Sequence, residues 1–234
     1  NIARILRAVD KAGLADDTLI VFSSDHGEMF GGHGRMKKNI FYEEAARVPF
    51  LMRWKGRIPA GSISDACLNT PDIMPTLLEV AGASYPRTGA PNDPPPLIGK
   101  SWVRYLAGEE ESPRTARDYL AWELFGERAI RQGTWKIRWE YKPFGTEAWE
   151  LFDLAADPGE HHDLSTQQPD RVRALSALWD EYAAANNVIL PSRSPWEGLE
   201  QSMPERFPVE PGYPPLLYRR QFVPPDSMMA EPKP

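Results

Sequence analysis

The sequence has little cysteine, no long apolar run and no excess of basic residues. Cys67 is the one cysteine in 234 residues, so a disulfide within the chain is excluded and the compartment stays open between cytoplasm and periplasm. No stretch is long and apolar enough to predict a membrane span. The 27 basic and 33 acidic residues give a net charge of -6 without a basic stripe, which argues against a nucleic-acid partner.

The chain also lacks an internal repeat, and neither an initiator methionine nor a signal peptide precedes Asn1. We therefore expect it to begin inside a domain. At 41% hydrophobic residues it can build a sizeable core. Its prolines gather in residues 191–234, which predict an extended tail that could dock on a second copy of the chain as a homo-oligomer contact.

The most informative stretch is residues 18–38, TLIVFSSDHGEMFGGHGRMKK. Thr18–Phe22 is apolar and β-branched without alternation, which is typical of a strand buried on both faces in a parallel sheet. Asp25 and His26 follow at its carboxyl end, where open α/β sheets bind ligands, and Gly27 permits a turn there. By itself the pair fits either a metal site or a turn cap with a loop hydrogen bond.

The segments around this stretch predict an α/β domain. Apolar residues on one helical face predict a helix from Ile2 to Gly13, and VPFLMRW predicts a second strand from Val48 to Trp54. Thr70 and Pro71 begin a helix that ends at Gly82, and we interpret Asp72 as a helix-terminal residue and not a metal ligand.

The second half predicts a smaller α+β unit. Four strand-like runs at residues 119–124, 128–131, 135–141 and 149–154 suit an antiparallel sheet, and residues 169–186 predict a helix across it. Its aromatic residues are interpreted as the core between sheet and helix, and Trp122, Glu123 and Phe125 as positions that could line a pocket. The aromatics assigned to this core are Trp122, Phe125, Trp135, Trp139 and Trp149.

Several words of the chain, in order, resemble the sulfatase family within the alkaline phosphatase superfamily. They are SSDHGE, GGHGRMKK, FYEEAARVPFLMRWKGRIPAG, RAIRQGTWKI and WELFDLAADPGEHHDL. The resemblance implies an alkaline-phosphatase-like α/β sandwich with a mostly parallel sheet, followed by a small subdomain with a four-stranded antiparallel sheet and one helix. It divides the chain into a catalytic half-domain at 1–117, the subdomain at 118–190 and the tail at 191–234.

The resemblance also assigns roles. Asp25 and His26 are expected to bind the divalent metal cation of the active site. Lys38, thirteen positions after Asp25, is expected to be a catalytic residue whose ammonium contacts the sulfate. The formylglycine nucleophile of the family is expected in an N-terminal half that this chain lacks, because Cys67 in CLNTP has no proline and arginine at the family's positions. His161 and His162 receive no catalytic role, and Lys37 is interpreted as a surface charge.

Three alternatives stay open. The first is a sulfatase acting on a small anionic ester with Ca²⁺, or with Mn²⁺, because His26 stands where related arylsulfatases carry asparagine and imidazole suits Mn²⁺ better. The second is a phosphonate monoester or phosphodiester hydrolase of the same superfamily, in which the Asp-His pair also occurs. The third is a non-catalytic fragment or interaction module.

Overall fold

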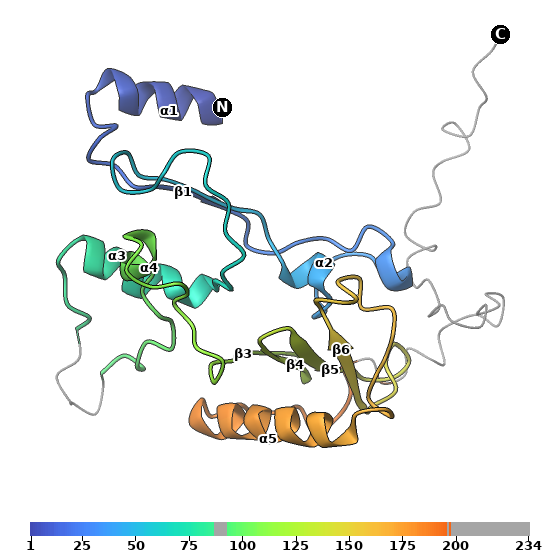
Figure 1. Cartoon of the computed structure of the whole chain (residues 1–234). Helices are drawn as coiled ribbons and strands as arrows, with labels where there is room; N and C mark the ends of the chain where they lie inside the picture. Colours follow the sequence, from blue (N-terminus) through green and yellow to red (C-terminus); the bar gives the residue numbers. More distant parts are fainter. Residues whose placement is uncertain (87–92, 196, 198–234) are drawn as a thin grey trace, which may run out of the picture. The chain divides into compact units, whose positions relative to one another are not determined.

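A computed structural model describes residues 1–86, 93–195 and 197, which form two compact units (Figure 1). The first unit contains Asn1–Ser24 and Pro49–Leu120, and the second contains Asp25–Val48 with the described residues from Ala121 on. The segment that carries Asp25, His26 and Lys38 is thus part of the second unit. These units are defined by compactness, whereas the predicted boundary at residue 117 separates two domains of the family, so that boundary stays a prediction. Most of the predicted tail at 191–234 lies outside the described residues.

The first unit contains helix α1 (Ile2–Lys11) and a two-stranded sheet of β1 (Ile20–Ser23) and β2 (Phe50–Arg53). The predicted positions of these elements are confirmed, but the two strands pair antiparallel. Phe22 and its cross-strand partner Leu51 are 45% and 59% exposed, so β1 is not buried on both faces as its composition predicts. An apolar run indicates a strand without specifying its neighbours, and the described residues contain no parallel partner for it.

The rest of the first unit packs around a buried acidic residue. A 3-10 turn (Thr70–Asp72) leads into α3 (Ile73–Val80), and α4 (Val103–Leu106) follows later in the chain. Asp72 is fully buried, and its carboxylate accepts hydrogen bonds from the Trp102 indole, the Lys100 amide and the Arg114 guanidinium. Because it also accepts from the Asn69 amide at the start of the turn, the interpretation of Asp72 as helix-terminal is supported.

The second unit contains the predicted four-stranded antiparallel sheet and its helix (Figure 1). The strands lie in the order β3 (Leu120–Leu124), β4 (Glu127–Gln132), β5 (Trp135–Trp139) and β6 (Trp149–Asp153). Helix α5 (Pro169–Ala185) contacts β4, β5 and β6. The central apolar side chains of this layer are fully buried, namely Ile130, Ile137 and Leu151.

Aromatic residues fill part of the same layer. Trp149 lies 6.1 Å from Trp179 of α5, and the Trp179 indole donates to the Trp122 carbonyl. Phe125 does not belong to this core: it is 53% exposed in the turn between β3 and β4, with a φ of 57°. A hairpin turn that reverses the chain between paired strands points its side chains outward, which the local sequence pattern did not indicate.

Candidate active site

The segment from Asp25 to Val48 folds back on itself, which brings residues distant in sequence together. The Gly27 amide donates to the Ala45 carbonyl at 2.8 Å, the Met29 amide to Lys37 at 2.9 Å, and the Gly31 amide to Arg35 at 2.8 Å. A short 3-10 turn (Gly32–Gly34) closes the tip, and helix α2 (Glu43–Ala46) follows the return. The thirteen residues from Asp25 to Lys38 therefore form one loop, which brings Lys38 back to the neighbourhood of Asp25.

Gly27 makes this fold possible because its backbone lies directly against α2. A Cβ atom at this position would overlap the carbonyl oxygen and carbon of Glu44 and crowd the Cα of Ala45. The glycine is required here for close approach of two backbones. The sequence predicts only a turn at Gly27, because it does not reveal which backbone lies opposite.

The fold places His26 between Asp25 and Lys38. The Lys38 ammonium contacts Nε2 of His26, and the same nitrogen lies 3.2 Å from Oδ2 of Asp25. Nδ1 of His26 lies 2.6 Å from the Gly27 carbonyl, which can only accept, so Nδ1 carries the proton and Nε2 presents its lone pair. The structure therefore brings together all three residues that the sequence predicted for the site.

The electrostatics of this group favour an ionised carboxylate. Desolvation raises the pKa of the Asp25 carboxyl, but backbone hydrogen bonds and the charge of the nearby Lys38 ammonium help to outweigh it, so the pKa lies below its usual range. The Asp25 side chain is 82% exposed and that of His26 is 34% exposed, so both can reach an incoming ion or substrate.

A carboxylate oxygen and a neutral Nε2 whose ring partner donates to a backbone carbonyl are a suitable pair of ligands for a divalent cation. Two ligands alone are fewer than such ions take from proteins. The part of the chain that the structure describes contains no group of three or more His, Cys, Asp or Glu side chains arranged to hold a metal. Asp25 and His26 are therefore suitable ligands for a divalent cation, but they make up only part of the ligands that such a cation needs.

Sequence reasoning missed a set of buried charges behind this segment. Lys136, Arg138 and Glu140 on β5 and just after it are 0%, 2% and 2% exposed. Burial lowers the pKa of Arg138, but the neighbouring Tyr42, Glu140 and Glu150 outweigh burial and raise that pKa above its usual value. The alternation in WKIRWE was the available signal, because charged residues at every second position of a strand share one face.

The remaining predicted residues lie in other surroundings. The Cys67 carbonyl accepts from Arg114 at 2.7 Å within the first unit, a structural contact. His162 donates its amide to the Asp157 carboxylate at 2.8 Å, and the His161 ring lies 5.2 Å from that of His33. The absence of a catalytic role for His161 and His162 stays a prediction.

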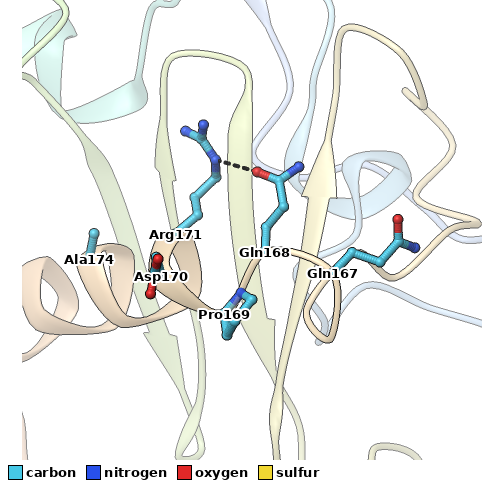
Figure 2. A pocket seen from close by; sticks show the side chains of 6 residues that line it. All are labelled: Gln167, Gln168, Pro169, Asp170, Arg171 and Ala174. Carbon is cyan, nitrogen blue, oxygen red and sulfur yellow. Dashed lines mark hydrogen bonds between the residues drawn. The ribbon is translucent and has the colours of Figure 1, made fainter.

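A shallow hollow of about 460 Å³ lies at the start of α5 (Figure 2). The six residues that line it are Gln167, Gln168, Pro169, Asp170, Arg171 and Ala174, and none of them is a predicted site residue. The dashed line in Figure 2 is the hydrogen bond from Arg171 to the Gln168 side chain, so these two lining residues bind each other. The hollow is open to solvent and contributes nothing to the group at His26.

Among the described residues, no helix is long and apolar enough to cross a membrane.

Comparison with known proteins gives one consistent family. Residues 1–83 match the family model described as Sulfatase. The N-acetylglucosamine-6-O-sulfatase of Bacteroides thetaiotaomicron is 33% identical over 173 residues, which cover 70% of this chain and 29% of that protein. The choline-sulfatase of Rhizobium meliloti is 32% identical over 187 residues, which cover 79% of this chain and 34% of that protein.

Solved structures agree with the sequence relatives. A structure described as a complex with its substrate D-glucosamine-2-N,6-O-disulfate matches with a TM-score of 0.64 and 29% identity, over 79% of this chain and 37% of that one. The chain thus spans roughly a third of the length of the relatives it matches.

Proposed function

We propose that this chain, a member of the sulfatase family with its α/β fold, is part of a protein that hydrolyses sulfate esters, and that it supplies Asp25, His26 and Lys38 to the active site. The observation that carries the proposal is the meeting of these three side chains at Nε2 of His26. A carboxylate, a neutral imidazole and an ammonium at one point are suited to a cation and an anionic ester together.

In this proposal Asp25 and His26 hold a divalent cation, which when bound polarises the ester as a Lewis acid. Asp25 gives an ionised oxygen, and the Gly27 carbonyl fixes the His26 ring so that Nε2 presents its lone pair. Lys38 then binds an oxygen of the sulfate and stabilises the negative charge that develops as the ester bond breaks. We propose that the formylglycine and the remaining cation ligands are contributed by polypeptide beyond these 234 residues.

A second candidate function rests on His26. Imidazole in place of an oxygen ligand favours Mn²⁺ over Ca²⁺, and a phosphonate monoester or phosphodiester would make the same demands on Asp25 and Lys38. The relatives named above act on sulfates, which is why we place sulfate esters first.

The test uses the full-length protein with paired aryl sulfate and aryl phosphonate esters, together with N-acetylglucosamine 6-sulfate and choline sulfate. Turnover is measured after chelation and after addition of Ca²⁺ or Mn²⁺. Lys38→Ala should lower kcat/KM for the sulfate ester roughly 10²–10³-fold, the usual effect of losing one group that stabilises an oxyanion. Lys37→Ala is the matched control, because it removes the same charge from the neighbouring position and should change kcat/KM less than about threefold.

The outcomes separate the alternatives. Dominant sulfate turnover that depends on metal and on Lys38 supports the proposal. Dominant phosphonate or phosphodiester turnover replaces the named function by the second candidate. If the folded protein turns over none of these esters with either metal, the chain is better described as part of a non-catalytic module.

A further inference from the structure

Strand β5 has one apolar face and one charged face. Ile137 is fully buried in the apolar face, and Trp135 lies under the Arg171 guanidinium of α5 at 3.9 Å, so this face is the one covered by the helix. Lys136, Arg138 and Glu140 alternate with these residues and are equally buried. Three buried charges on one face of a strand are costly to desolvate unless each has a partner.

The partners come from the return segment, Arg35–Glu43, which carries Lys38. At its start, Arg35 donates to Oε1 of Glu140 at 2.5 Å, and the other oxygen of Glu140 accepts from Arg138 at the same distance. At its end, Lys136 donates to Oε1 of Glu43 at 2.9 Å. The charged face of β5 therefore holds the return segment at both ends.

Further contacts close the same arrangement. Arg138 donates to the Tyr42 hydroxyl at 2.7 Å, and its guanidinium lies 3.9 Å from the centre of the Tyr42 ring. Glu160 accepts the Glu43 amide at 2.6 Å and lies 3.0 Å from the Lys136 ammonium. Between the two held ends, Ile40 is 4% exposed, so the middle of the return segment is anchored as well.

Apolar contacts alone would hold the segment without fixing its register. Met29, Ile40 and Ala45 already form a small core on its inner side, and such packing tolerates sliding better than hydrogen-bonded charge pairs do. Buried ion pairs add little net stability but select one geometry. Lys38 lies three residues from Arg35, so a shift of the Arg35–Glu140 pair moves the backbone that presents the ammonium.

We infer that Glu140 and Lys136 are positioning residues for catalysis: by holding the two ends of the return segment, they set the position of the Lys38 ammonium relative to Asp25 and His26. The inference rests on the proposed function, because it assigns to the C-terminal sheet a part in the same active site. Neither residue touches substrate in this account. Each acts through the backbone of the return segment.

The test is a double-mutant cycle in the full-length protein between Glu140→Gln and Lys38→Ala. If Glu140 acts through Lys38, Glu140→Gln should lower kcat/KM up to roughly 10²-fold, the scale of an ångström-sized misplacement, with the loss in kcat. In the Lys38→Ala background the same change should lower kcat/KM less than about twofold. An equal fold-loss in both backgrounds would overturn the inference.

Glu147→Gln is the matched control, because Glu147 is 39% exposed and pairs with Lys142 at 3.4 Å on the surface. It should leave kcat/KM unchanged in both backgrounds. If Glu140→Gln does not fold, Arg35→Lys tests the other side of the same pair, since it keeps the charge but loses the guanidinium geometry. Lys136→Met should show the same coupling to Lys38→Ala from the far end of the segment.

Hydrogen exchange gives a readout that does not depend on turnover. Peptides that cover residues 35–43 should lose protection at least tenfold in Glu140→Gln and keep it in Glu147→Gln. If protection is unchanged, the positioning inference fails even when sulfate is hydrolysed. If protection is lost but the wild type hydrolyses no ester, the hold of β5 on the segment stands and it is the proposed function, with the catalytic role built on it, that fails.

Discussion

The sharpest stability prediction concerns the ion pair between Arg114 and Asp72. Arg114→Met removes a guanidinium that contacts the fully buried Asp72 carboxylate at 2.7 Å. The amides of Asn69 and Lys100 and the Trp102 indole still donate to Asp72, but these neutral donors offset the buried charge only in part. Breaking a buried pair from one side costs about 3–5 kcal/mol, and every 1.4 kcal/mol is about tenfold in an equilibrium.

The assay is native-state hydrogen exchange of the α3 amides in the full-length protein. Arg114→Met should raise the opening equilibrium of α3 roughly 10²–10⁴-fold. Arg104→Met is the control, because Arg104 pairs with Glu109 and Glu110 on the surface with 64% of its side chain exposed, and its loss should cost at most about 1 kcal/mol.

A compensating variant guards against a purely steric explanation. Asp72→Asn in the Arg114→Met background removes the uncompensated charge and should recover most of the lost protection. The reasoning is refuted if Arg114→Met changes the opening equilibrium less than tenfold, or if the Asp72→Asn double variant is no better protected than the single one.

Two further changes test the fold of the second unit. Gly27→Ala should lower both sulfate turnover and exchange protection at Ala45, because its Cβ overlaps the Glu44 carbonyl. Gly61→Ala, at a φ of +73° with nothing within 4 Å of the Cβ, strains only its own turn and should affect neither. Burial raises the pKa of Tyr42 from 10.0 to about 12. The unfolded chain therefore releases this proton first, so the free energy of unfolding should fall as the pH rises from 10 to 12, and urea titrations should show a smaller fall in Tyr42→Phe.

Much of the local structure could be predicted from the sequence. Period-two and helical patterns located the four strands and α5, and the words around Asp25 and His26 identified the segment that carries the site. These signals are short-range, since each depends on residues within one element. The family's Asp-to-Lys spacing pointed to Lys38, whose ammonium contacts His26, and its catalytic role stays a prediction.

What could not be predicted depends on contacts between distant segments. Pattern alone did not show that β1 pairs antiparallel with β2, or that Phe125 faces solvent in a turn. The charged residues of β5 resembled an ordinary solvated strand face, because burial of Lys136 makes sense only once Glu43 and Glu160 are known to lie against it.

The second unit is formed by two separate stretches of the chain, and this has a consequence for synthesis. Asp25–Val48 leaves the ribosome well before β5, yet the charges that hold it belong to β5. At ordinary translation rates, about 5–20 s separate the two events. During that interval residues 25–48 lack their β5 contacts and are exposed to chaperones and proteases. A chain that ends before Lys136 lacks the charged side chains that hold residues 35–43 in place.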